Sequence, residues 1–194
     1  MTQGDRVFLV GELGFKDEIE AAGFIVVTED SVQTTMTDDE FQSFQLDPRV
    51  KAVLVGIDFN FSYRRLCIAS LYVQAGCKLI ASNKDRHATN RKGDYNPGGG
   101  CIVKAIETAS QTKAEVMGKP SRFAFDLIRI ENDLQDKPLS RFLMTGDNLQ
   151  TDIKFAQVNG IDSLLVLTGV TNITKCQHFL QNGVDSTEAL PTHI

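Results

Sequence analysis

The sequence predicts an α/β protein whose parallel strands are covered by helices on both faces. Short apolar runs alternate with amphipathic stretches along almost all of the 194 residues, and such strand–helix–strand units form parallel sheets through right-handed crossovers. Two of the amphipathic stretches end at Gly23 and Gly76, and glycine is the usual residue just past a helix end. The composition, with 42% hydrophobic and 23% charged residues, is that of an ordinary globular protein.

The first part of the chain alternates in this way from its first apolar run onward. Strands are expected at the short apolar runs, which are residues 6–11, 24–27, 51–58 and 78–82. Helices are expected where apolar residues follow helical spacing, at residues 13–23, 63–76 and 101–110. The polar and acidic stretch 28–47 predicts a loop or a short helix.

The pattern restarts after Thr112. Helices are expected at residues 121–134, 151–160 and 175–183, and strands at residues 141–147 and 162–170. The restart predicts two α/β pieces with a boundary near Lys113.

Charge and hydropathy exclude several classes of protein. A net charge of −5 argues against a nucleic-acid surface, which needs clustered Lys and Arg. The apolar runs are far too short to span a membrane, and the first fifteen residues lack the pattern of a secretory signal. The four cysteines have no CxxC spacing, so we expect buried, reduced thiols and a cytoplasmic protein.

The strongest local signal is the segment TGDNLQTD, in which Asp147 follows an apolar strand and Asp152 lies in the next helix. Ligands of open parallel sheets bind outside the carboxyl ends of the strands, where Asp147 is expected. Two carboxylates there suit Mg²⁺, which takes one or two carboxylates and keeps waters and substrate phosphate. The alternative is that Asp147 opens a turn and Asp152 only complements the helix dipole.

Lys119 is a second candidate, because Pro120 beside it suits the first position of a helix. An amine at a helix N-terminus holds phosphate well, although, taken alone, the residue is better explained as a solvated surface lysine. Pro97-Gly98-Gly99-Gly100 predicts a turn and a helix start and is no dinucleotide fingerprint, since a long polar loop separates it from the strand. Asp58 resembles a strand-end nucleophile, but Asn60 follows where a second acid is needed, so we reject it.

In order and spacing, these segments resemble the haloacid dehalogenase superfamily, in its branch of p-nitrophenylphosphatases, phosphoglycolate phosphatases and pyridoxal phosphatases. The matching segments are RVFLVGELGFKDEIEAAGF, AVLVGIDFNFSYRRL, IASNKD, NPGGGCIVKAIETAS, GKPSRFAF, MTGDNLQTDI and LLVLTGV. The resemblance implies an inserted α/β cap domain, residues 1–113, followed by the C-terminal half of a Rossmann-like parallel-sheet hydrolase core, residues 114–194.

The resemblance also assigns roles to residues. Lys119 matches the lysine that steadies the phosphoryl group, Asp147 matches the Mg²⁺ ligand, and Asp152 matches the second acid of that motif. The loop from Asn83 to Gly100 matches the cap segment that reads the substrate. Its expected contacts are Asn83, Asp85, His87, Gly98 and Gly100.

The implied activity is Mg²⁺-dependent hydrolysis of a small phosphorylated metabolite, of the p-nitrophenyl phosphate, 2-phosphoglycolate or pyridoxal phosphate type, through an aspartyl-phosphate. The family's nucleophile and acid/base aspartates lie in a DxDG motif, which does not occur in these 194 residues. We therefore expect a fragment of such a phosphatase, inactive by itself. The alternative is a catalytically inactive α/β module that acts in oligomerisation or regulation, with a homodimer formed through the cap.

Overall fold

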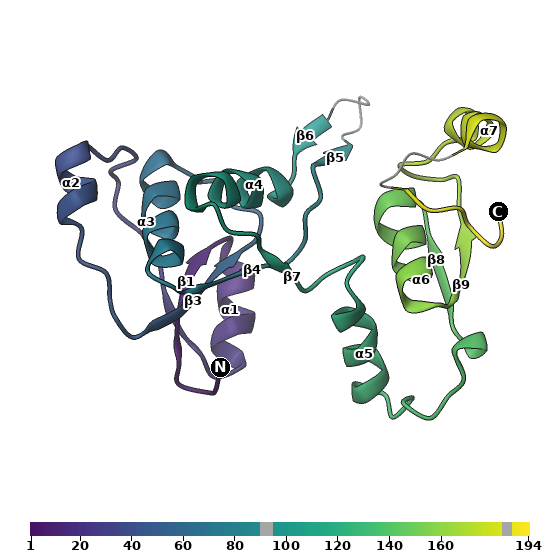
Figure 1. Cartoon of the computed structure of the whole chain (residues 1–194), viewed down its shortest axis with the longest axis horizontal. Coiled ribbons are helices and arrows are strands. Elements are labelled where there is room, and N and C mark those ends of the chain that lie inside the picture. Colours follow the sequence, from purple (N-terminus) through teal and green to yellow (C-terminus); the bar gives the residue numbers. More distant parts are fainter. Residues whose placement is uncertain (90–94, 184–187) are drawn as a thin grey trace. The chain divides into compact units, whose positions relative to one another are not determined.

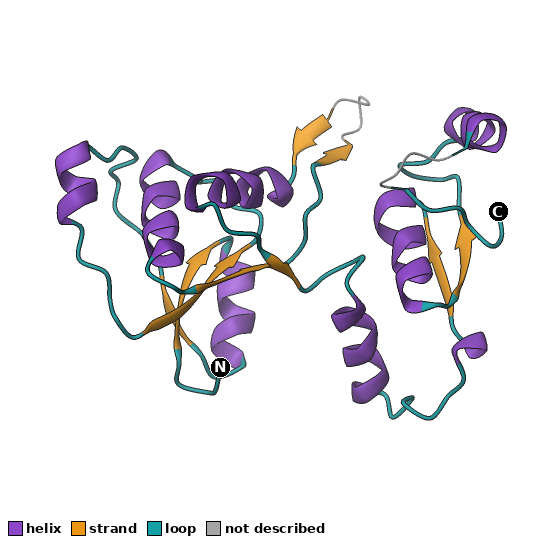
Figure 2. Cartoon of the chain, in the orientation of Figure 1, coloured by secondary structure: helices purple, strands orange, loops and turns teal. Residues whose placement is uncertain are grey.

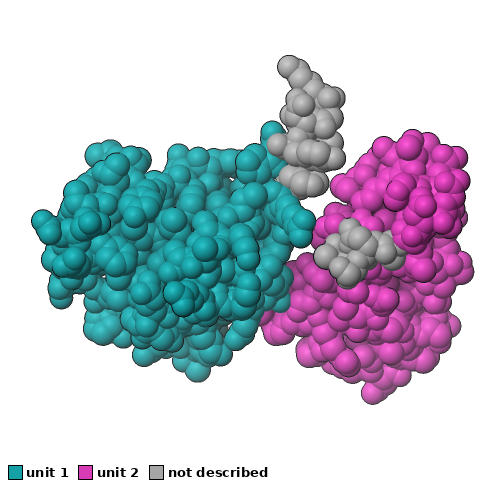
Figure 3. Space-filling model, turned by 45° about the horizontal axis from the view of Figure 1, so that its top comes forward, with its two compact units in different colours: residues 1–116 teal, residues 117–194 magenta. Residues whose placement is uncertain are grey.

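The computed structural model describes residues 1–89, 95–183 and 188–194. The chain divides into two compact units, Met1–Val116 and Met117–Ile194, which Figure 3 shows in two colours. The division lies at Val116, three residues beyond Lys113, because a short strand, β7 (Glu115–Val116), still pairs with the sheet of the first unit.

The first unit is built on a parallel sheet of five strands (Figure 1). The sheet has the order β2-β1-β3-β4-β7, and its other strands are β1 (Arg6–Val10), β2 (Ile25–Val27), β3 (Val50–Val55) and β4 (Lys78–Ala81). The chain runs outward from β1 to β2 and then crosses back to β3. The strand order therefore reverses between β1 and β3, and this is the place where doubly wound sheets bind ligands.

Helices cover both faces of this sheet (Figure 2). The alternation of side chains along β1 separates two cores, since Phe8 and Val10 belong to one buried cluster and Val7 and Leu9 to another. The first cluster includes residues of α3 (Tyr63–Gln74) and α4 (Gly99–Ser110), and the second includes Ile19 of α1 (Leu13–Ala21). Helix α2 (Asp38–Ser43) begins with a capping box, in which Thr37 and Glu40 satisfy each other's backbone N–H groups.

A hairpin in the first unit was not predicted. Strands β5 (His87–Thr89) and β6 (Tyr95–Pro97) pair antiparallel, whereas the sequence pattern indicates only a polar loop there. Three-residue strands of polar residues carry no apolar alternation, so the pattern gives no signal for them. Residues 90–94, which complete the loop expected to read substrate, lie outside the described residues.

The second unit has two parallel strands, β8 (Leu143–Gly146) and β9 (Asp162–Leu165). Its helices are α5 (Arg122–Glu131), α6 (Lys154–Asn159) and α7 (Ile173–Asn182). The helix expected at 151–160 divides into a π-helical turn, Leu149–Ile153, and α6. The strand expected at 162–170 ends at Leu165, and the backbone then turns back toward Asp147. The C-terminal residues return to β9, where His193 exchanges hydrogen bonds with Ser163 and Leu165.

The fold class predicted from the sequence, α/β with parallel sheets, is confirmed. Among the residues that the structure describes, every helix is too short or too polar to cross a bilayer. All four cysteines are free, as expected, but only Cys67 and Cys176 are buried, and Cys101 is exposed at the start of α4.

Candidate functional site

Asp152 is the most firmly held carboxylate of the second unit. It is 4% exposed, and its Oδ2 accepts hydrogen bonds from the backbone N–H groups of Asp147 and Asn148, each at 3.1 Å. Its Oδ1 accepts from Lys119 Nζ at 2.6 Å. The carboxylate thus joins the π-helical turn, the loop after β8 and the segment before α5.

Asp147 lies directly after β8 and accepts hydrogen bonds from the segment that follows β9. Its Oδ2 accepts a hydrogen bond from Val170 N–H at 2.6 Å, and its carbonyl oxygen accepts from Thr171 N–H at 3.0 Å. A Cβ on Gly169 would collide with the Asp147 carboxylate, and one on Gly146 would collide with the side chain of Asp152. Neither Gly146 nor Gly169 is predicted from the sequence; the available signal was a glycine at or shortly after the end of each of two apolar strands.

Lys119 reaches the site in a way that the sequence did not predict. Pro120 is not the first residue of α5, since Ser121 is the N-cap and its hydroxyl accepts from Phe123 N–H. The Lys119–Pro120 peptide is cis. The side chain of Lys119 remains 48% exposed while its ammonium donates to Asp152. Two further N–H donors of the ammonium are therefore left for an anionic ligand.

The residues of this site fit part of a Mg²⁺ site. Within the described ranges, no group of three or more His, Cys, Asp or Glu side chains lies close enough to hold a metal ion. Asp152 is already engaged by Lys119 and two amides, which leaves Asp147 as the carboxylate that could bind a metal ion. Mg²⁺ is commonly held by one or two carboxylates, with waters and substrate phosphate completing its shell. One protein carboxylate beside an exposed lysine matches that chemistry.

The residues expected to contact substrate in the first unit lie around the N-terminus of α4. Asn83 Oδ1 accepts from Asp85 N–H at 3.1 Å, and Gly98 N–H donates to the Arg86 carbonyl at 2.9 Å. Gly100 N–H donates to the Asp85 carbonyl at 2.8 Å, and a Cβ on Gly100 would collide with the Lys84 carbonyl. Only glycine therefore allows this loop to pack on the helix start.

His87 lies at the start of β5, where its backbone pairs with Pro97. Its side chain lies outside the description of the structure. Lys84, three residues before His87, donates from Nζ to buried Glu107 at 2.7 Å. Burial raises the pKa of Glu107, while hydrogen bonds from Lys84 and from Ala114 N–H outweigh burial, so the pKa lies below its ordinary value.

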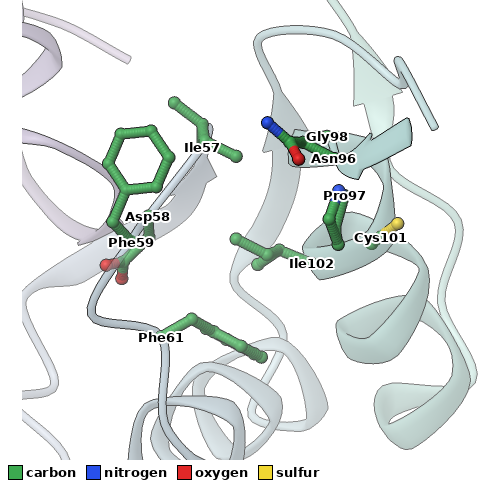
Figure 4. Close-up of a pocket in the computed structure, with 9 residues that line it drawn as sticks. All are labelled: Ile57, Asp58, Phe59, Phe61, Asn96, Pro97, Gly98, Cys101 and Ile102. Carbon is green, nitrogen blue, oxygen red and sulfur yellow. The ribbon is translucent and has the colours of Figure 1, made fainter. Parts of the chain in front are cut away.

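A pocket of about 580 Å³ opens beside this loop (Figure 4). It lies between the segment after β3 and the start of α4, and its lining is mostly apolar: Ile57, Asp58, Phe59, Phe61, Asn96, Pro97, Gly98, Cys101 and Ile102. It is thus at the carboxyl end of β3, next to the point where the strand order reverses.

Asp58 contributes to this pocket but is not free for chemistry. It is 5% exposed, its Oδ2 accepts from Arg65 Nη1 at 2.7 Å, and its Oδ1 accepts from Asn60 N–H at 2.8 Å. A buried carboxylate that is paired and closes a turn has a structural role. The geometry supports the rejection of Asp58 as a nucleophile.

Known proteins that are similar to this chain include hydrolases, among them named phosphatases. Residues 116–191 match the HAD-hydrolase-like family. The chain is 44% identical to the glycerol-3-phosphate phosphatase of Gallus gallus over 130 residues, which are 66% of this chain and 41% of that protein. It is 36% identical to chronophin of Homo sapiens over 178 residues, which are 91% of this chain and 56% of that protein.

Solved structures that are similar to this chain also include a phosphatase. A glycerol phosphate phosphatase from Mycobacterium tuberculosis, crystallised with magnesium, superposes with a TM-score of 0.69 at 30% identity. The superposition covers 88% of this chain and 45% of that one. The chain therefore spans about half the length of the relatives that it matches.

Proposed function

Since the chain belongs to the haloacid dehalogenase superfamily, we propose that it forms part of a Mg²⁺-dependent phosphatase that hydrolyses small phosphomonoesters. The observation that carries this proposal is the contact of Lys119 with buried Asp152 beside the loop that presents Asp147. A structural ion pair alone would not require the exposed ammonium, the two amide donors and the two glycines that crowd the carboxylates of Asp152 and Asp147.

In this proposal, Asp152 holds the ammonium of Lys119 in place, and the free N–H groups of Lys119 bind a phosphoryl oxygen. Asp147, oriented by Val170 N–H, is the ligand for the metal. Mg²⁺, when bound, would offset negative charge on the phosphoryl group. The aspartyl nucleophile and the acid/base aspartate that the family resemblance implies are not among these 194 residues and must come from outside them.

We propose that residues 1–116 act as the cap that selects the substrate. The pocket at Gly98 and the hydrogen bonds that Gly98 and Gly100 donate to the Arg86 and Asp85 carbonyls support this role. The 44% identity to a glycerol-3-phosphate phosphatase makes glycerol 3-phosphate the first substrate to test, ahead of pyridoxal phosphate and 2-phosphoglycolate. A homodimer formed through the cap and a cytoplasmic location remain proposals, and light scattering on the purified chain tests the first of them.

The test supplies the missing segment in cis. The part of the Gallus gallus protein that precedes its matched region is fused to this chain, and Mg²⁺-dependent release of phosphate from glycerol 3-phosphate is measured. The variants Lys119→Ala and Asp147→Asn should each lower kcat by about 100-fold or more. Lys154→Ala is the matched control and should change little, because this partly exposed lysine donates a hydrogen bond to Gln157 at 2.7 Å.

The unfused chain should hydrolyse p-nitrophenyl phosphate at the background rate. A folded fusion with no phosphatase activity on any of the three substrates would contradict the proposal. So would Mg²⁺-dependent turnover by the unfused chain that Asp147→Ala abolishes, because the reaction would then need no nucleophile from outside.

A further inference from the structure

Glu107 of α4 is a buried carboxylate of the first unit. Its side chain is 5% exposed, and its Oε1 accepts hydrogen bonds from Lys84 Nζ at 2.7 Å and from Ala114 N–H at 2.9 Å. Lys113 Nζ lies 3.9 Å from its Oε2. One carboxylate therefore joins α4 to the segment that follows β4 and to the segment that precedes β7.

One of these two contacts is anchored in the sheet. Ala114 stands directly before β7, which pairs with β4, so its N–H holds the Glu107 carboxylate at a fixed place beside the sheet edge. Lys84 lies three residues after the end of β4, in a segment without regular secondary structure. The ion pair with Glu107 therefore ties an irregular segment to a fixed point.

The backbone next to Lys84 also packs on the first turn of α4. We define the loop base as residues 84–86 together with residues 98–101. The carbonyl groups of the two residues after Lys84 accept hydrogen bonds from Gly100 N–H at 2.8 Å and Gly98 N–H at 2.9 Å. A Cβ on Gly100 would collide with the Lys84 carbonyl. The loop base is thus held at the start of α4 by its backbone and, one side chain further, by Glu107.

The loop base and the residues beside it form one wall of the pocket of about 580 Å³ (Figure 4). The residues of this wall are Asn96, Pro97, Gly98 and Cys101. A shift of the loop base would move this wall, because Gly98 belongs to both.

Stability alone is a poor explanation of the pair between Glu107 and Lys84. The cost of taking two charges out of water offsets most of their attraction, and well-packed apolar residues of similar size often serve as well or better. A pair with fixed partners does, however, select one arrangement of the segments that carry it. Here those segments are α4, β7 and the loop base.

We propose that Glu107 is a positioning residue for substrate binding, which acts through Lys84 to hold the loop base and the pocket wall in the arrangement that fits the substrate. The inference rests on the proposed function for the role of the pocket. Neither residue needs to touch the substrate. A wall that is displaced weakens binding of the ground state and of the transition state alike, so KM should rise while kcat stays the same.

The kinetic experiment uses the fusion described above, with glycerol 3-phosphate as substrate. Lys84→Met and Glu107→Gln should each raise KM by about tenfold and change kcat by less than about twofold. The double variant should be no worse than either single one, because both changes remove the same contact. Lys84→Arg keeps the charge and a donor, so its KM should stay within about threefold of wild type. Lys104→Met, at an exposed lysine of α4, is the matched control and should leave KM unchanged.

A second measurement needs no activity and uses the unfused 194-residue chain. Hydrogen exchange is followed by mass spectrometry in the peptide that contains Gly98 and Gly100. In Lys84→Met this peptide should exchange about tenfold faster, whereas peptides of α3 should keep the wild-type rate, because only the loop base is released. Tyrosine fluorescence in a urea titration checks that the first unit is folded in each variant.

An active fusion in which Lys84→Met or Glu107→Gln leaves KM unchanged would overturn the inference, and so would a loss that falls on kcat alone. Unchanged exchange of the Gly98–Gly100 peptide would also overturn it, as would equal acceleration in α3, since the pair would then only stabilise the unit. A fusion without phosphatase activity, combined with faster exchange confined to the loop base, would overturn the proposed function and leave the positioning of the loop base by Glu107 supported.

Discussion

Replacement of Asp152 by alanine should unfold the second unit at a much lower denaturant concentration while it leaves the first unit unchanged. The carboxylate is buried and accepts three hydrogen bonds, one from Lys119 and two from the backbone N–H groups of Asp147 and Asn148. All three donors lose their acceptor at once in the variant.

The magnitude follows from these contacts. Each backbone N–H that loses its acceptor inside the protein costs about 1–3 kcal/mol, so the two together cost about 2–6 kcal/mol. The ion pair with the half-exposed Lys119 adds about 1 kcal/mol at most, because solvent can replace Asp152 there. The free energy of unfolding of the second unit should thus fall by about 2–7 kcal/mol, a large part of the stability of a small domain.

The chain allows the two units to be followed separately. It contains no Trp, and its three tyrosines, Tyr63, Tyr72 and Tyr95, all lie in the first unit. In a urea titration, tyrosine fluorescence therefore reports the first unit alone, while far-UV circular dichroism reports both. Asp152→Ala should move the unfolding of the second unit, seen by circular dichroism, to lower urea concentration. The transition of the first unit, seen by tyrosine fluorescence, should stay where it is.

Asp126→Asn is the matched control in the same unit. Asp126 forms an exposed ion pair with Arg122 at 3.5 Å, so its loss should cost about 0.5 kcal/mol or less. Equal midpoints for Asp152→Ala and Asp126→Asn would refute the reasoning. An equal shift of the tyrosine transition would show that Asp152 does not act within the second unit alone.

Three further predictions concern stability and flexibility. Gly146→Ala should destabilise the second unit by about 1–3 kcal/mol, because the added Cβ collides with Asp152. Gly14→Ala is the control: its Cβ meets no atom within 4 Å, so the change should be neutral or stabilising by about 0.5–1 kcal/mol. Urea midpoints measured by circular dichroism compare the two variants. The pKa of Glu107 is lowered on folding, so its carboxylate stabilises the first unit above pH 4.5 and loses this effect as pH falls through the lower folded pKa. Glu107→Gln should therefore be most costly at pH 7 and much less so at acidic pH, and a tyrosine-fluorescence titration that shows the same cost at both would contradict this. Limited proteolysis should cut first between the two units, near Met117 and Gly118, and mass spectrometry should find a stable fragment that ends there; uniform resistance along the chain would count against two independently folded units.

Much of the fold follows from local patterns. The strands at Arg6–Val10, Val50–Val55 and Lys78–Ala81 and the helix at Tyr63–Gln74 lie where apolar periodicity places them, with ends within about three residues. Periodicity succeeds there because each element buries a regular face. It fails for the polar hairpin of β5 and β6, whose pairing depends on the backbone and not on apolar side chains.

For the site, the sequence by itself determined which residues are candidates for the chemistry: Asp147 at a strand end, Asp152 five residues later, and Lys119 beside a proline. Only the tertiary structure decided what each carboxylate contacts. Asp152 is turned by the π-helical turn toward Lys119 and two amides, whereas Asp147 is held by the Gly169–Thr171 segment. Partners that lie more than twenty or thirty residues away in the chain leave no periodic signal, because they meet only when the strands align.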